Sequence, residues 1–210
     1  MQENNNKIFN HLKIHTQYSI CEGAIKISEL KDYCRENNIK SVGLSDTSNL
    51  CGSLEFSENL SKSGTQPIIG TQILFNFKGD VGLLSLIAKS ESGYKRIIEL
   101  SSKSYLNNDK NVEPQCNLKD LLEQPNDIIL LSGSINGLIG RLFNKGKFSE
   151  IEEIYKIVKE IYKDNFYIEI QRHGDVNEKS FEIFNLKLSK KLEIPIIASN
   201  EVYYLDKSMH

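Results

Sequence analysis

The stretch that predicts the fold class is residues 41–77, SVGLSDTSNLCGSLEFSENLSKSGTQPIIGTQILFNF. The short apolar run 41–46 predicts a buried strand, and 67–77 predicts a second strand. Between them, 52–63 has the length of a helix, and Gly64 follows as a residue that ends helices. A strand, a helix and a strand in this order are typical of a parallel sheet, in which helices connect neighbouring strands.

Strands and helices are expected to alternate along the rest of the chain. The segments predicted as helices are 26–37, 92–105, 148–163 and 176–191, and those predicted as strands are 7–15, 83–88, 127–132, 166–171 and 194–199. Ser28 is the expected N-cap of the first helix, and 107–117 is expected to be a surface loop. The pattern predicts an α/β domain with a mostly parallel sheet, which is either an open doubly wound sheet or a closed barrel.

The composition favours a soluble protein with one core. Apolar residues make up 39% and charged residues 26% of the chain, and no apolar run reaches the ~18 residues of a membrane span. The Asn-rich residues 1–7 are expected to be a disordered tail before a domain spanning 8–210.

The four cysteines form no C-x-x-C pair, which favours a location in the reducing cytoplasm. A net charge of −2 provides no overall field that would attract nucleic acid.

Polar residues follow several predicted strands, at the end where functional side chains collect in parallel α/β folds. They are His15, Asp46, Gln72, Ser132, Ser134, His173, Asn200 and Glu201. Histidine and carboxylate groups bind metals, but each residue alone is more often a hydrogen-bonded structural residue or a cap. A centre with two metals about 3.5–4 Å apart needs more ligands than the His and acidic residues of this set.

Other active-site motifs are absent from the sequence. It contains no G-x-x-x-x-G-K-[ST] phosphate loop, no G-x-S-x-G nucleophile elbow and no D-x-D pair. A palm-type polymerase centre needs neighbouring carboxylates that hold Mg²⁺. The chain is therefore not expected to polymerise nucleotides by itself.

Seven stretches carry a resemblance to a known family, and they occur in the family's order. They are HLKIHTQYSICEGAIKI (11–27), VGLSDTSNLCGSLEFSE (42–58), QPIIGTQILF (66–75), LIAKSESGYKRIIELSSKSY (86–105), LLSGSINGLIGRL (130–142), YIEIQRHG (167–174) and IPIIASNEVYYL (194–205). With them, the chain resembles the PHP (polymerase and histidinol phosphatase) domain at the N-terminus of bacterial DNA polymerase III alpha subunits. The resemblance implies a distorted (β/α)7 TIM-like barrel, C-terminally truncated because family members continue beyond this point.

The resemblance also implies a pocket that has lost its metal chemistry. Active members hold a metal cluster at the barrel mouth and hydrolyse phosphoesters, in some polymerases as a 3′-5′ proofreading exonuclease. The corresponding positions here are Lys13, His15, Asp46, Thr47, Gln72, His173, Glu201 and Tyr203. Only His15, Asp46 and His173 keep the family's ligand, and Glu201 is a similar substitute. Lys13 replaces a histidine and is expected to stand in for a cation by pairing with Asp46 or Glu201. We interpret the pocket as vestigial, with no catalytic residue and no cofactor.

Two classes of function remain open from the sequence. The favoured hypothesis is a non-catalytic domain of a DNA-directed DNA polymerase, a nucleotidyltransferase whose own Mg²⁺ site lies in other domains. The expected partners are the epsilon proofreading exonuclease subunit, the other alpha-subunit domains and, through them, DNA; no membrane is expected. The alternative is a phosphoesterase or 3′-5′ exonuclease that binds Zn²⁺ or Mn²⁺ through His15, Asp46 and His173. A pyrophosphate-hydrolysing role is a third hypothesis, and it meets the same metal objection.

Overall fold

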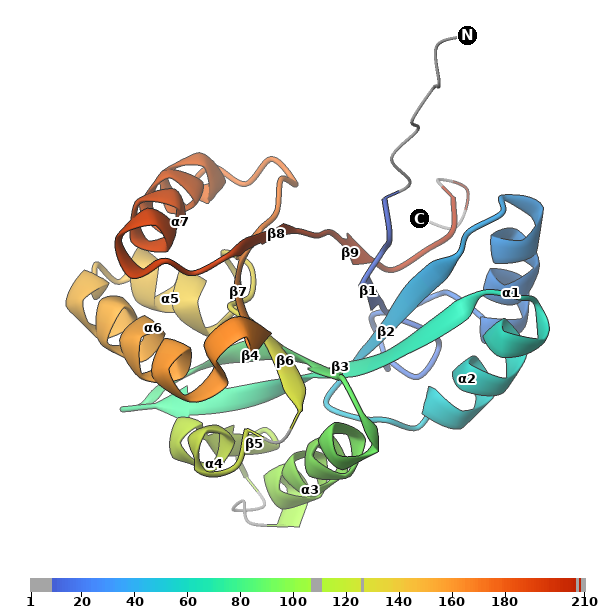
Figure 1. The fold of residues 1–210 in the computed structure, drawn as a ribbon, viewed down its shortest axis with the longest axis horizontal. Helices are drawn as coiled ribbons and strands as arrows, with labels where there is room; N and C mark the ends of the chain where they lie inside the picture. Colours follow the sequence, from blue (N-terminus) through green and yellow to red (C-terminus); the bar gives the residue numbers. More distant parts are fainter. Residues whose placement is uncertain (1–8, 107–110, 126, 207, 209–210) are drawn as a thin grey trace, which may run out of the picture.

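The computed structural model describes residues 9–106, 111–125, 127–206 and 208, and strands and helices alternate along them (Figure 1). The strands are β1 Lys13–Ile14, β2 Ser41–Thr47, β3 Gln66–Phe77, β4 Asp80–Ala88, β5 Gln115–Asn117, β6 Ile128–Leu131, β7 Phe166–Ile170, β8 Ile196–Ala198 and β9 Glu201–Val202. The helices are α1 Ile27–Glu36, α2 Ser53–Lys62, α3 Glu91–Leu106, α4 Leu118–Glu123, α5 Leu138–Asn144, α6 Phe148–Tyr162 and α7 Glu178–Leu192, and a 3₁₀ turn, η1, covers Lys163–Asn165. The expected tail 1–7 and positions 107–110 of the expected loop lie outside the described residues.

The strands form one strongly curled sheet whose two edges are joined by the chain itself. The order is β8-β7-β6-β4-β3-β2-β1-β9, and β5 pairs with β3 off this path. Although β8 and β9 stand at opposite ends of the order, only Ser199 and Asn200 separate them in the sequence. The β8–β9 segment therefore pairs with β7 at one end and with β1 at the other, and it crosses the opening of the curled sheet in Figure 1.

One strand interrupts the mostly parallel arrangement. β4 runs antiparallel to both of its neighbours, β3 and β6, whereas the other described pairs are parallel. The cause is the two-residue connection Lys78-Gly79, in which both residues have positive φ, 52° and 91°. Such a turn joins antiparallel strands, because a parallel connection needs a crossover of a dozen or more residues.

The first predicted strand is much shorter than expected. Residues 7 and 8 of the predicted 7–15 lie outside the described part, and within 9–15 only β1 is a strand, although the His11 carbonyl accepts a bond of 2.7 Å from the backbone of Gly43. A Cβ at Gly43 would lie 2.4 Å from the Leu12 carbonyl, so only glycine lets the chain cross β2 this closely. The expected cap Ser28 is wrong, because α1 begins at Ile27 and its N-cap is Lys26. The short helices α4 and α5 were not predicted, and the expected loop 107–117 is wrong at its end, because Gln115–Asn117 form β5 and pair with β3.

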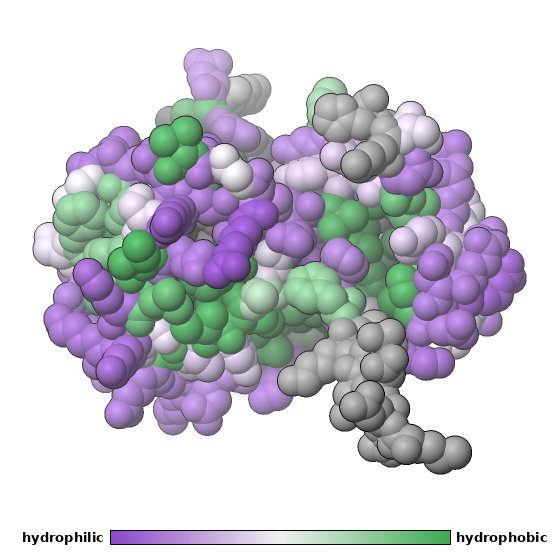
Figure 2. All heavy atoms as spheres, turned by 90° about the horizontal axis from the view of Figure 1, so that it is seen from above, coloured by the Kyte–Doolittle hydropathy of each residue, from purple (hydrophilic) through white to green (hydrophobic). Residues whose placement is uncertain are grey.

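Helices cover the outer face of the sheet and enclose two hydrophobic clusters. The larger cluster joins β3, β4, β6 and β7 to α3–α7, and the smaller one joins β1 and β2 to α1 and α2. Among the helices of the described residues, none lies over β8 on the outside of the sheet in Figure 1, and Figure 2 shows the molecule from that side. None of the described helices is long and apolar enough to cross a membrane. The interior of the curled sheet is left for polar side chains.

Candidate functional site

The candidate site is a cavity of about 450 Å³ at the carboxyl ends of the parallel strands. Its lining includes Lys13 from β1, Gln72 from β3, Glu201 from β9 and, from loops after strands, His173 and Tyr203. Successive residues of a strand point to opposite faces, so Lys13 and His15 lie on one face of the chain at β1. That face is the interior of the curled sheet.

Lys13 is buried between two carboxylates at the base of this cavity. Its Nζ lies 3.0 Å from Glu169 Oε1 and forms a second ion pair with Glu201 Oε1. Burial alone would lower the pKa of Lys13, but the charges of Glu169 and Glu201 and their hydrogen bonds outweigh it and raise the pKa. The ammonium therefore stays charged although it is shielded from water.

Glu201 is the residue on which the site's hydrogen bonds converge. Its second oxygen, Oε2, lies 2.7 Å from His15 Nε2 and accepts a bond of 2.9 Å from the Gln72 amide. Burial would raise the pKa of Glu201, but the hydrogen bond from His15 and the charge of Lys13 lower it to about 2. The ring of Tyr203 stacks on His15 with centroids 4.4 Å apart, and burial together with the Glu201 charge raises the pKa of Tyr203.

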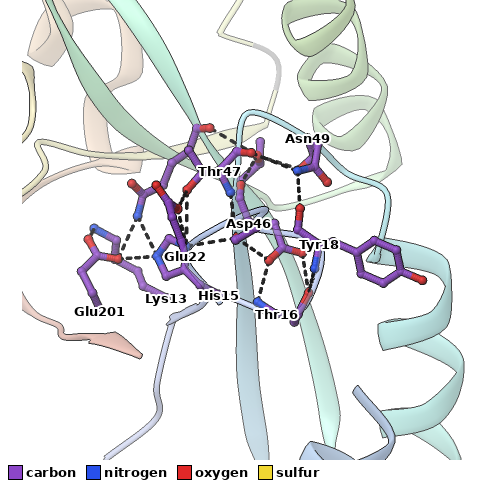
Figure 3. Close-up of polar contacts among 12 residues, drawn as sticks. Lys13, His15, Thr16, Tyr18, Glu22, Asp46, Thr47, Asn49 and Glu201 are labelled. Atoms are coloured by element: carbon purple, nitrogen blue, oxygen red, sulfur yellow. Dashed lines mark hydrogen bonds and ion pairs between the residues drawn. The ribbon is translucent and has the colours of Figure 1, made fainter. Parts of the chain in front are cut away.

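Asp46 is fully buried and organises the loop after β1. Its carboxylate accepts bonds from the backbone and hydroxyl of Thr16, at 2.6 and 2.8 Å, and from the Ser19 hydroxyl at 2.8 Å. Ser19 Oγ lies 3.3 Å from His15 Nδ1, so His15 lies between the Glu201 and Asp46 groups (Figure 3). Of the two partners expected for Lys13, Asp46 or Glu201, the ion pair forms with Glu201. Asp46 is thus occupied in shaping the loop.

Thr47 and His173, the remaining expected positions, have different surroundings. The Thr47 hydroxyl donates to Glu22 at 2.5 Å and lies 3.5 Å from His15 Nδ1, at the upper edge of the site. The side chain of His173 is 44% exposed, and its Nδ1 lies 3.6 Å from Glu178. Glu178 also accepts the backbone N–H of His173, so it fixes the loop after β7. His173 lines the cavity, but it makes its polar contacts with Glu178 and not with His15 or Asp46.

The residues that sequence reasoning missed come from β7 and its surroundings. Glu169 lies on the interior face of β7, Gln171 follows directly after the strand, and both are buried. The Gln171 amide donates to Glu169 Oε1 at 2.7 Å and to Glu201 Oε1 at 3.3 Å, and the Ser199 hydroxyl also donates to Glu169. The signal was a polar residue at every second position of FYIEIQ, which places these side chains on the same face.

The donor set does not fit a metal ion as it is arranged. A lysine ammonium occupies the space between Glu169 and Glu201, where it neutralises the charge that a dication would need. The three bonds to the Asp46 carboxylate come from neutral donors of the loop. Over the described parts of the chain, no group of three or more His, Cys, Asp or Glu side chains is placed to hold a metal. No catalytic step through a metal follows from this geometry.

A curled sheet covered by helices, with polar side chains at its mouth and with these motifs, defines a class of barrel proteins. The chain belongs to the PHP domain family, which it matches over residues 11–173. Among curated proteins, it is 33% identical over 205 residues to the DNA polymerase III subunit alpha of Rickettsia conorii, covering 96% of this chain and 17% of that protein. It is 32% identical over 201 residues to the DNA polymerase III subunit alpha of Haemophilus influenzae, covering 94% of this chain and 17% of that protein. The chain thus spans only a small part of the length of these relatives.

Solved structures confirm the expected TIM-like PHP fold. An amidohydrolase from Chromobacterium violaceum, solved with bound sulfate and no metal, matches with a TM-score of 0.59 at 8% identity, over 92% of this chain and 87% of that one. A metal-dependent phosphoesterase from Bifidobacterium adolescentis matches with a TM-score of 0.51 at 12% identity, over 93% and 87% of the two chains. At such identities the likeness concerns the fold alone.

Proposed function

We propose that the chain is the N-terminal PHP domain of a DNA polymerase III alpha subunit and that it acts without metal, as a scaffold that docks a proofreading exonuclease subunit. The identities of 31–34% to alpha subunits, over nearly the whole chain, support the placement within such a polymerase. Polymerisation, with its Mg²⁺ site, belongs to other domains of the subunit, which works on DNA in the cytoplasm.

The observation that carries the metal-free role is the buried Lys13 ammonium. Its charge holds Glu169 and Glu201 together, as a metal ion would. Unlike a metal ion, it offers no coordination site and cannot activate a water molecule. The mouth therefore keeps a fixed shape without a metal. A fixed, non-hydrolytic barrel mouth suits a protein-binding role, because docking needs preorganised surfaces rather than reactive groups.

The metal-free role is tested by metal titration and by cleavage of a primer with a mismatched 3′ end. We expect no saturable heat of binding with Zn²⁺ or Mn²⁺ and no cleavage above that of the His15→Ala variant. Metal-dependent cleavage that disappears in His15→Ala would overturn the proposal in favour of the phosphoesterase alternative.

The docking role is tested by pull-down of the exonuclease subunit from the same organism. Single alanine replacements would cover strongly exposed apolar side chains, among them Ile20, Leu54, Leu106 and Val176. At least one replacement is expected to weaken binding while the circular dichroism of the domain is unchanged. Binding that resists every exposed replacement, or that is absent from the unmodified protein, contradicts a docking role.

A further inference from the structure

A small polar chamber lies behind the mouth cavity, between the end of β7 and the start of α7. Its volume is about 10 Å³, and its lining includes Glu169 of β7, Gln171 directly after that strand and Glu178 of α7. Gln171 and Glu178 also line the mouth cavity, so the two spaces are neighbours. A chamber of this size is about the smallest that holds one water molecule.

Two buried oxygen atoms of this lining lack a hydrogen-bond donor. Glu169 Oε2 and Gln171 Oε1 are shielded from solvent, and neither has a partner within the described residues. The other polar atoms of both side chains are engaged. Glu169 Oε1 lies 3.0 Å from the Lys13 ammonium and accepts a bond of 2.7 Å from the Gln171 amide, which also donates to Glu201 at 3.3 Å. A buried oxygen without a donor costs free energy, so each of the two requires a partner.

The orientation of the Gln171 amide follows from the charges beside it. Turning the amide by half a revolution would place its oxygen 2.7 Å from Glu169 Oε1 and 3.3 Å from Glu201 Oε1. Ionised carboxylates only accept hydrogen bonds, so these contacts would be repulsive. The amide nitrogen therefore faces the two carboxylates, and the donor for the Gln171 oxygen comes from neither of them.

We propose that the chamber binds one water molecule, which donates its two hydrogens to Glu169 Oε2 and Gln171 Oε1. A water molecule matches the size of the chamber and supplies the two donors that these oxygens require. Buried waters typically bond to polar groups that have no other partner, whereas apolar cavities stay dry. The bound water holds the Glu169 carboxylate through the oxygen other than the one that pairs with Lys13. The shape of the mouth then depends on an ammonium and a water molecule together, whether or not a partner docks on the domain.

A high-resolution crystal structure of the protein tests this water site. We expect one density peak within hydrogen-bond distance, about 2.6–3.2 Å, of both Glu169 Oε2 and Gln171 Oε1. A crystal soaked in rubidium chloride distinguishes water from a monovalent cation, because rubidium gives an anomalous signal and water gives none. The Tm is expected to be the same in potassium chloride and in choline chloride at equal concentration, since a bound cation would stabilise the folded state by mass action.

Two matched variants test whether the water bridges the two side chains. Gln171→Met removes the amide while keeping an unbranched side chain, and Gln66→Met makes the same change at an exposed position. The density peak is expected to be lost in Gln171→Met and retained in Gln66→Met. If Gln171→Met does not fold, the native crystals decide the question by themselves.

Three results on the native protein would overturn the inference: a chamber without density, an anomalous rubidium peak in it, or a Tm that is higher in potassium chloride than in choline chloride. The last two would assign the chamber to a monovalent cation. A peak that persists unchanged in Gln171→Met would also overturn it, because the water would then not depend on the Gln171 oxygen.

Discussion

Replacing Lys13 with methionine removes the charge that joins the two buried carboxylates while keeping an unbranched side chain of similar length. In the native protein, the ammonium lies 3.0 Å from Glu169 and also pairs with Glu201. The Glu169 side chain is fully buried and that of Glu201 is 14% exposed, so water replaces little of the lost interaction. We expect Lys13→Met to destabilise the domain strongly.

The magnitude follows from two independent considerations. Removing one partner of a buried ion pair typically costs about 3–5 kcal/mol. Two carboxylates less than about 6 Å apart repel each other by about 3 kcal/mol at an effective dielectric constant of 20. For a protein of this size, a loss of 3–5 kcal/mol lowers Tm by about 6–20 °C. The exposed Lys62→Met change is the control, because the Lys62–Glu58 pair is 3.4 Å long and open to solvent on both sides.

The pH dependence adds a second readout for the same variant. In the native protein the pKa of Glu201 is lowered to about 2 from an ordinary value of 4.5, so its stabilisation is present above pH 4.5 and is lost as the pH falls toward 2. In Lys13→Met the Glu201 carboxyl loses the lysine charge that lowers its pKa, while burial still raises that pKa, so the variant regains stability as the pH falls from 7 toward 4.5. Urea unfolding at pH 7 and pH 5, followed by circular dichroism, measures both effects. A variant within about 1 kcal/mol of the native protein at pH 7, or an unchanged difference at pH 5, would refute the reasoning.

Three further substitutions test other parts of the structure. Asp46→Ala leaves the buried donors of Thr16 and Ser19 without an acceptor and should lower the free energy of unfolding by about 2–4 kcal/mol in urea titrations; a loss below 1 kcal/mol would show that the loop is held by other contacts. Lys78→Asn creates the Asn-Gly sequence preferred by this hairpin turn and should raise stability by about 0.5–1 kcal/mol, and a lower Tm would contradict the assigned turn. Two lysine hydrogen bonds lower the pKa of Asp80. The stabilisation by Asp80 is therefore present above the ordinary carboxyl pKa and is lost as the pH falls below it. Asp80→Asn should make the free energy of unfolding depend less on pH in this acidic range. A free energy of unfolding that falls as steeply with acid as in the native protein would argue against this assignment.

The order of the main strands and helices could be predicted because each has a clear apolar period. The antiparallel hairpin of β3 and β4 was not predicted, because the strands expected at 67–77 and 83–88 left five residues between them, whereas β4 begins at Asp80. The shortness of β1 was not predicted either, because it depends on how closely the chain crosses β2 at Gly43. α4 and α5 are 6 and 7 residues long, too short for a periodic pattern to stand out.

The candidate site could be predicted as a set of positions but not as a set of contacts. Strand ends and family motifs indicated Lys13, His15 and Glu201, and these residues do meet. The pairing of Lys13 with Glu169 joins strands that are far apart in the sequence, and a local pattern carries no information about that distance. The same limit explains why the contacts of Asp46 were not predicted. Its carboxylate accepts hydrogen bonds from the loop after β1 and does not pair with the Lys13 ammonium.

The joining of the two sheet edges by β8 and β9 has a consequence for how the protein is made. His15 and Glu201, which meet at this closure, are 186 residues apart. At roughly 5–20 residues per second, a ribosome needs about 10–40 s to add that length of chain. Throughout this interval the edge of β1 that pairs with β9 is open, and the Lys13 ammonium lacks its Glu201 partner. The sheet therefore closes only after β9 has been made, when every other described strand has already left the ribosome.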